Sequence, residues 1–348
     1  MAQQHSPVAA RAVSITEVAR RAGVAVGTVS NVLNHPERVA PAKREMVLKI
    51  IREVGFVRND AARQLRAGQS RTIGQIVLDA GNPFFMDVAR GAEDEAMKRG
   101  NLVLLGNSGH DAAREARHID SFEQQRVLGL LISPVDANLD RLDALRNRGV
   151  VPILVDRKED PEKYSSVAVD DVAGGYLAAR HLIDQGRRRL AYVSGPVGIH
   201  QVADRLAGAQ AAVAEFPGVT LEVLERDALT VIQGRAAGEH LVERGRAQMP
   251  DGIFCANDLL ALGVLQALTM LRTIRVPEDV ALVGYDDIDF ASSAVVPLTS
   301  VRQPTELLGR TAVELLCEEV DTPGAHRQVV FKPELVVRGS SVAQTPTH

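Results

Sequence analysis

The sequence predicts an α/β protein in which an N-terminal unit of three short helices and a hinge helix precedes a two-lobed core of doubly wound parallel sheets. Residues 14–66 show only helical patterns, whereas from Thr72 onward continuous apolar runs alternate with amphipathic helices. This alternating order predicts parallel sheets with helical crossovers. The alternating part has about 270 residues, which exceeds one comfortable hydrophobic core, so two lobes are expected.

The N-terminal unit, residues 14–58, is expected to contain three helices around one small core. Ser14 and Glu17 have the spacing of a capping box, which predicts the start of the first helix. Gly23 and Gly55 are expected to end helices, because glycine adopts the left-handed conformation of such turns without steric cost. The predicted helices run from Ser14 through Ala22, from about Val26 to Leu33, and from about Pro41 to Val54.

Residues 59–71 are expected to form a hinge helix and a linker. The stretch NDAARQLRAG, which begins at Asn59, contains good helix formers but only one large apolar residue, Leu65. A helix this short, without an apolar face to bury, is not stable in isolation. We therefore expect it to be helical only conditionally.

The core is expected to span residues 72–342, with one lobe over 72–170 and 303–330 and the other over 171–302 and 331–342. Its strand candidates are continuous apolar runs, which are typical of strands that helices cover on both faces. They are Ile73–Leu78, Leu102–Leu105, Leu130–Ile132, Ile153–Val155, Leu190–Val193, Ile253–Cys255 and Val280–Val283. Helices are expected between them, for example over Phe85–Arg99 and Gly174–Gln185.

The charge is unevenly distributed along the chain. Residues 1–68 carry eleven Lys and Arg against five Asp and Glu, so +6 on this end and −10 on the rest make up the formal net charge of −4. A basic end on an acidic body favours a module that binds a polyanion. Within it, SITEVARRAGVAVGTVSNVLN predicts a helix-turn-helix whose second helix fits the major groove of DNA. An ordinary helical hairpin is the alternative.

Composition and motifs argue against several other classes of protein. Two cysteines, Cys255 and Cys317, provide neither a disulfide framework nor a metal-ligand spacing, which suits a reducing compartment. No run reaches the ~18 apolar residues of a membrane span, and the start of the chain lacks the apolar segment of a signal peptide, so a cytoplasmic protein is expected. The sequence also lacks the common hydrolase, metalloprotease and nucleotide-binding motifs, so we expect no enzyme, cofactor or metal.

The order of several motifs resembles the lactose and galactose repressor family (LacI/GalR). These motifs are ITEVARRAGVAVGTVSNVLN, AAR with LRAG, NPFF, DR, CANDLLALG and VGYDDIDF, and the resemblance extends from Ser14 to about Ser340. It implies a helix-turn-helix unit, a hinge helix and a core like that of periplasmic sugar-binding proteins. It also implies a homodimeric repressor that binds pseudo-palindromic double-stranded operator DNA and responds to a sugar or a related metabolite.

By position, Val26, Gly27 and Asn31 match the residues that read base edges in this family. Asn31 departs from the arginine of many relatives, and asparagine favours adenine where arginine favours guanine. Leu65 matches the hinge leucine that, in the family, is wedged with its symmetry mate between base pairs from the minor groove. A leucine packed on the core is the alternative. Further contacts, chiefly to phosphates, are expected from Thr28, Ser30, Asn34 and Asn59.

Residues near the expected strand ends are candidates for binding the effector, because open parallel sheets bind ligands beyond their carboxyl edges. The chain has no tryptophan, so Phe84 and Leu229 are expected to supply apolar surface for a sugar. The candidates are Phe84, Asp156, Arg157, Arg205, Leu229, Asn257, Asp286 and Gln303. For each polar one, a loop cap or a salt bridge is the alternative. Asp258 is expected to cap a helix, and Asp287 to lie on the surface or at a lobe contact.

Two other functions remain open from the sequence. A global catabolite-type regulator, whose core is controlled by a phosphocarrier protein, would have a similar sequence. A solute-binding protein would explain the core but not the basic N-terminal unit. His110 with Asp111 is an isolated pair without a partnered nucleophile, so it is expected to be a surface or structural feature.

Overall fold

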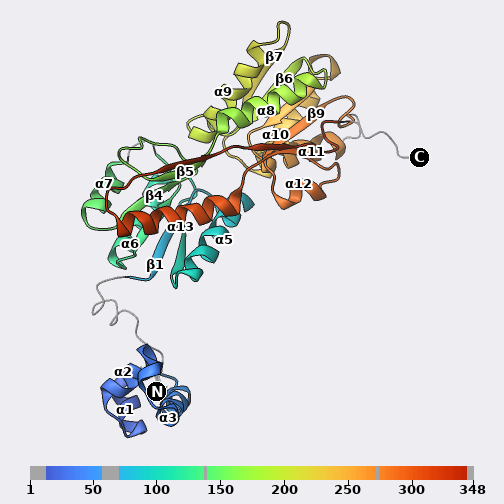
Figure 1. Cartoon of the computed structure of the whole chain (residues 1–348). Helices are drawn as coiled ribbons and strands as arrows, with labels where there is room; N and C mark the ends of the chain where they lie inside the picture. Colours follow the sequence, from blue (N-terminus) through green and yellow to red (C-terminus); the bar gives the residue numbers. More distant parts are fainter. Residues whose placement is uncertain (1–12, 57–69, 137–138, 271–273, 343–348) are drawn as a thin grey trace, which may run out of the picture. The chain divides into compact units, whose positions relative to one another are not determined.

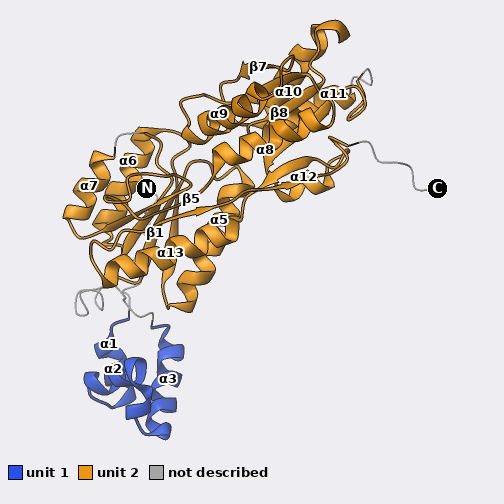
Figure 2. Cartoon of the chain, turned by 45° about the horizontal axis from the view of Figure 1, so that its top comes forward, with its two compact units in different colours: residues 1–69 blue, residues 70–348 orange. Residues whose placement is uncertain are grey.

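The computed structural model describes residues 13–56, 70–136, 139–270 and 274–342 (Figure 1). The chain divides into two compact units, residues 1–69 and 70–348 (Figure 2). The predicted hinge residues Asn59 and Leu65 lie outside the described residues. Within the described ranges, no helix is long and apolar enough to cross a membrane.

Unit 1 consists of short helices around a small core. They are α1 (Ile15–Ala22), α2 (Val26–Asn34), the 3₁₀ helix η1 (Pro36–Arg38) and α3 (Pro41–Val54). The Ser14 hydroxyl caps α1 by accepting a hydrogen bond from the Glu17 amide at 3.2 Å. Gly23 and Gly55 end α1 and α3 with φ of 61° and 63°, in the left-handed region that favours glycine. The core is formed by Val18, Ala19, Ala22, Val29, Val32 and Val47.

Unit 2 contains two six-stranded sheets, each the centre of one lobe. Lobe one has the strand order β11-β5-β4-β3-β1-β2, with every pairing parallel. Its strands are β1 (Thr72–Val77), β2 (Leu102–Asn107), β3 (Gly129–Ile132), β4 (Val151–Val155), β5 (Ser166–Val169) and β11 (Gln328–Phe331). The predicted doubly wound parallel architecture is confirmed here.

Lobe two has the strand order β12-β10-β9-β8-β6-β7. Its strands are β6 (Arg189–Ser194), β7 (Thr220–Glu225), β8 (Gly252–Cys255), β9 (Ala281–Asp286), β10 (Thr299–Arg302) and β12 (Glu334–Val336). Only β12 runs antiparallel to its neighbour within this sheet. The chain passes between the lobes after β5, after β10 and after β11, so residues late in the sequence complete both sheets.

Helices cover both sheets and leave the carboxyl ends of the strands free for loops. Lobe one has α5 (Pro83–Lys98) and α13 (Thr305–Asp321) in one apolar cluster, and α6 (Ala112–Gln124) and α7 (Asp140–Asn147) in another. Lobe two has α8 (Asp171–Asp184), α9 (His200–Ala214), α10 (Val231–Glu243), the 3₁₀ helix η2 (Arg246–Gln248), α11 (Asp258–Met270) and the short α12 (Asp289–Ser293).

One helix pair depends on two glycines. A Cβ at Gly309 of α13 would lie 1.9 Å from the carbonyl oxygen of Val88, and one at Gly91 of α5 would lie 2.2 Å from that of Glu306. Both distances are far inside contact range, so α5 and α13 reach their close packing only because neither position has a side chain.

The structure differs from the sequence expectation at the sheet edges. The run Leu102–Leu105 was expected to be covered on both faces, but β2 is an edge strand and Leu102 is 64% exposed. The strands β5, β7, β10, β11 and β12 were not predicted. Of these, β7 (TLEVLE) is also an edge strand. It was missed because its polar residues interrupt the continuous apolar run that is typical of a buried strand.

Candidate functional site

A pocket lies at the carboxyl ends of the strands, and residues of both lobes line it. It contains about 450 Å³ of empty space, counting the part open to solvent. Lobe one contributes Leu78, Asp79, Asn82, Phe84, Phe85, His110 and Asp156, and lobe two contributes Ile199, Gln201, Val202, Arg205, Leu229, Asn257 and Asp286.

Arg205 is the buried cation of the pocket. From the second turn of α9 its Nε donates to Asp171 at 2.7 Å, and one terminal nitrogen donates to the Ala256 carbonyl at 2.7 Å. The guanidinium also lies over the Tyr285 ring, 3.6 Å from its centroid. Burial lowers the pKa of Arg205, but the neighbouring carboxylates outweigh this effect and keep the pKa well above its usual value. Arg205 is therefore a fixed positive charge.

Asp286 ends β9 and is a second carboxylate beside this cation, farther from it than Asp171. Its Oδ1 lies 3.8 Å from Arg205 and accepts from Gln303 at 2.8 Å, while its Oδ2 accepts from Asn82 at 3.2 Å. Its φ of 103° is rare for a residue other than glycine, and such strain is concentrated at functional sites. Burial raises the pKa of Asp286 to about 6, although Arg205 and the two amides favour the charged form.

Asp156, which follows β4, is the corresponding carboxylate of lobe one. Its φ is 60°, and its Oδ2 accepts from Gln201 at 2.9 Å. Its Oδ1 is buried and has no hydrogen-bond partner among the residues that the structure describes. Burial, with a contribution from the nearby Asp171, raises the pKa of Asp156 well above its usual value. A ligand that donates a hydrogen bond to Oδ1 would remove this penalty.

Asn257, Leu229 and Phe84 complete the part of the pocket that the sequence predicts. The Asn257 side chain is buried; its amide donates to the Leu229 carbonyl at 3.2 Å, and its Oδ1 accepts from the Leu260 amide at 2.9 Å. Phe84 is buried with an edge-to-face contact to Phe85, their ring centroids 5.0 Å apart. Both phenylalanines line the pocket.

Six of the eight predicted effector residues thus line one pocket, and two do not. Gln303 lies behind Asp286 and orients it through the 2.8 Å hydrogen bond. Arg157 is directed elsewhere: it donates to the Asp136 carbonyl at 2.6 Å and to Glu159 at 2.9 Å, both in lobe one. Its position directly after Asp156 suggested a shared site, but successive residues at a strand end point in different directions.

Sequence reasoning missed two amides and underrated one histidine. Asn82 and Gln201 line the pocket and contact its carboxylates. His110, expected to be a surface or structural residue, is solvent exposed and also lines the pocket. For Asn82 the signal was its place in NPFF, before the aromatic candidate Phe84. No local pattern singles out Gln201.

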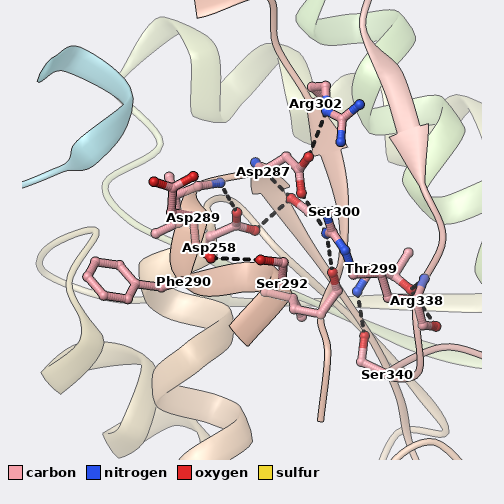
Figure 3. Close-up of polar contacts among 12 residues, drawn as sticks. Asp258, Asp287, Asp289, Phe290, Ser292, Thr299, Ser300, Arg302, Arg338 and Ser340 are labelled. Atoms are coloured by element: carbon pink, nitrogen blue, oxygen red, sulfur yellow. Dashed lines mark hydrogen bonds and ion pairs between the residues drawn. The ribbon is translucent and has the colours of Figure 1, made fainter. Parts of the chain in front are cut away.

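Two expectations about neighbouring acids were wrong. Asn257, not Asp258, caps α11, and the Asp258 carboxylate accepts from the Ile288 amide at 2.9 Å and from the Ser300 hydroxyl at 2.7 Å (Figure 3). Asp287 is not a surface or lobe-contact residue, since its side chain is 4% exposed and pairs with Arg302 at 2.7 Å and Arg338 at 2.6 Å. Buried carboxylates need such partners, and this network fixes the backbone directly behind Asp286.

In unit 1, α2 presents the predicted DNA-contacting residues. Val26, Gly27, Asn31 and Asn34 are exposed, while Thr28 and Ser30 are partly exposed. Val26 is 42% exposed although it is apolar. The Asn34 amide donates to the Ser30 carbonyl and hydroxyl at 2.9 and 3.2 Å.

Comparison with known proteins covers both units. Residues 14–59 match the model of the lacI family of bacterial regulatory proteins, and residues 179–341 match a periplasmic binding protein-like domain. The chain is 33% identical over 333 residues to the HTH-type transcriptional repressor PurR of Photobacterium profundum, covering 94% of this chain and 98% of the relative. It is 31% identical over 340 residues to the ribose operon repressor of Escherichia coli K12, covering 94% and 99%.

Solved structures agree with these matches. The lac repressor dimer bound to operator and the anti-inducer ONPF superposes with a TM-score of 0.82 at 25% identity, covering 96% of this chain and 100% of that one. The complex of the transcriptional regulator CelR with cellobiose superposes with a TM-score of 0.69 at 32% identity, covering 94% and 100%. Because relatives of this similarity match almost the entire chain, it belongs to the lacI family of bacterial regulatory proteins.

Proposed function

We propose that this chain represses transcription as a homodimer on a pseudo-palindromic operator, under the control of a small carbohydrate or related polyol bound in the pocket. The observation that carries the proposal is the convergence of Arg205, Asp286, Asn257 and Asp156, from both lobes, on one pocket in a chain that also has an exposed helix-turn-helix. Related chains of known function include a ribose operon repressor and a cellobiose-bound regulator.

On the DNA side, α2 is the proposed recognition helix. The exposed amide of Asn31 is suited to a bidentate contact with adenine in the major groove, and Val26 to contact with a thymine methyl. Thr28, Ser30 and Asn34 would position the unit on phosphates. Asn59 and Leu65 of the hinge keep the roles that the family resemblance gives them, with Leu65 as the minor-groove wedge.

On the effector side, the charges favour a neutral ligand. The pocket is lined by three carboxylates, Asp79, Asp156 and Asp286, and by one arginine, Arg205. The arginine is buried and already paired with Asp171. A phosphate or carboxylate would meet more negative than positive charge, whereas hydroxyl groups donate to the carboxylates and accept from the arginine. Phe84, Phe85 and Leu229 supply apolar surface for the face of a ring.

Operator binding is proposed to be controlled through linkage between the effector pocket and the DNA-binding unit. An effector that favours one arrangement of the lobes changes the hinge segments and with them operator affinity. If the effector prefers the DNA-incompetent state by ~3 kcal/mol, operator affinity falls by roughly 150-fold. A corepressor would act through the same linkage with opposite sign.

A thermal-shift panel of neutral sugars, sugar phosphates and nucleosides, with D-ribose included, tests the effector class. A true ligand at one hundred times its Kd stabilises the folded chain by ~2.7 kcal/mol. Hits are then added to the chain on its operator to measure release or tightening. If only sugar phosphates stabilise the chain, the neutral-ligand proposal is wrong. If no compound stabilises the chain and a phosphocarrier protein alters its binding to operator, the small-molecule proposal is wrong and the phosphocarrier protein is the regulator.

A further inference from the structure

The two buried carboxylates of the pocket are placed alike in the two lobes. Asp156 follows β4 of lobe one and Asp286 ends β9 of lobe two, and both are buried with a positive φ, 60° and 103°. Each lobe therefore presents a strained aspartate to the pocket at the carboxyl edge of its sheet. Asp287, with a φ of 54°, follows Asp286 but does not line the pocket. Holding an ordinary side chain in this backbone conformation has an energetic cost, so the placement of both carboxylates is strongly specified by their surroundings.

Each carboxylate is bound by an amide of the opposite lobe. Gln201 of lobe two donates to Oδ2 of Asp156 at 2.9 Å and to its carbonyl oxygen at 2.6 Å. Asn82 of lobe one donates to Oδ2 of Asp286 at 3.2 Å. One donor comes from each lobe, and the two pairs join the lobes across the pocket. We refer to them as the amide latch.

The latch makes the contacts that a ligand between the lobes would make. Amide N–H groups and ligand hydroxyls are both neutral donors to a carboxylate. In the latched state the Asp156 Oδ1 is also buried and has no hydrogen-bond partner among the described residues. A ligand therefore reaches the pocket carboxylates fully only after the lobes have separated and the amides have left.

We propose that Gln201 is a specificity-determining residue that holds the effector-free lobes together and competes with the effector for Asp156. This inference rests on the proposed function, because it assigns the pocket to an effector. An effector must then donate hydrogen bonds to the carboxylates in place of the amides. A molecule without such donors cannot separate the lobes. Gln201 suits this role better than Asn82, whose Oδ1 also caps α5 by accepting from the Phe84 amide at 3.1 Å.

The experiment measures the distance between the lobes in the full chain without effector or DNA. Spin labels are placed at Ala113→Cys of α6 and Ala236→Cys of α10, which are exposed residues of lobes one and two, in a Cys317→Ser background. Labelled chain is diluted with unlabelled chain to suppress distances between subunits. We expect one short distance for the otherwise unaltered chain. Gln201→Met, which keeps the length but removes the donor, should add a longer distance.

Two further variants separate the latch from general damage. Gln266→Met changes an exposed glutamine of α11 in the same way and should leave the distance unchanged. Asn82→Ser keeps a helix cap but is too short to reach Asp286, so it should lengthen the distance as Gln201→Met does. The proposal is overturned if Gln201→Met, folded with an unchanged melting temperature, retains the short distance, or if the unaltered chain is already open. Neither result affects the proposed function, which the ligand panel tests separately.

Discussion

Asp286 makes the stability of the chain depend on pH in a direction opposite to that of ordinary surface carboxylates. Burial raises its pKa to about 6, compared with ~3.9 for an aspartate in an unfolded chain. The folded state therefore binds a proton at a pH where the unfolded state does not. Stability from this group is gained as the pH falls through 6 and is lost as the pH rises through the same value.

The magnitude follows from these two pKa values. Between pH 7.5 and pH 5, Asp286 should increase the free energy of unfolding by about 1 kcal/mol, because at pH 5 it is mostly protonated in the folded state only. Asp156 and Asp258, whose pKa values are also raised by burial, act in the same direction. A comparison with Asp286→Asn reports the titration of Asp286 together with its coupling to Asp156 and Asp258, because more distant groups titrate alike in both chains.

The assay is denaturant unfolding of the effector-free chain and of Asp286→Asn at pH 7.5, 6 and 5. We expect the difference in unfolding free energy between the two chains to shift in favour of the unaltered chain by about 1 kcal/mol from the highest to the lowest pH. A constant difference would show that Asp286 is not titrating near pH 6, and a shift of opposite sign would show that its charged form is favoured. Either result refutes the assigned electrostatics.

Three further predictions concern the DNA contacts and the helix packing. Asn31→Ala should relax the preference at one base pair of each half-site by ~1–3 kcal/mol, and an unchanged consensus in a binding-site selection would rule out its base contact. Leu65→Ala should weaken binding to operator far more than to non-specific DNA in titrations at fixed salt, whereas equal losses would contradict the wedge. Gly309→Ala should lower the free energy of unfolding by ~2 kcal/mol or more, because its Cβ would lie 1.9 Å from the Val88 carbonyl oxygen. The control Gly27→Ala has open space around its Cβ and should be neutral or stabilising by up to ~1 kcal/mol. Similar losses in the two variants would refute the packing argument.

The sequence predicts the architecture well where one local rule decides the outcome. Helix α3 is predicted and observed from Pro41 to Val54, because a proline at its start, an apolar stripe and a terminal glycine all agree. Arg205, Asn257 and Asp286 are predicted to share a site, since parallel strands bring their carboxyl ends to one edge, and they line one pocket.

Prediction from sequence fails where the answer depends on the packing of one lobe against the other. Gln201 lies in the first turn of α9 and has no pattern of its own, and it gains significance only because Asp156 of the opposite lobe is 2.9 Å away. Prediction also fails at Asp258, where contacts within one lobe decide the outcome, and Asn257 takes the capping role that was expected of Asp258. The Ser300 hydroxyl and the Ile288 amide, both distant in sequence, draw the Asp258 carboxylate away from the helix end.

The three passages of the chain between the lobes have a consequence for how the protein is made. The sheet of lobe one takes its edge strand β11 from Gln328–Phe331, and the sheet of lobe two takes β12 from Glu334–Val336. During synthesis neither sheet is complete until these residues have left the ribosome, although the helices of unit 1 emerge first. A ribosome that stops before residue 328 therefore releases a chain that contains the DNA-binding unit but two unfinished sheets, each with an exposed strand edge prone to aggregation.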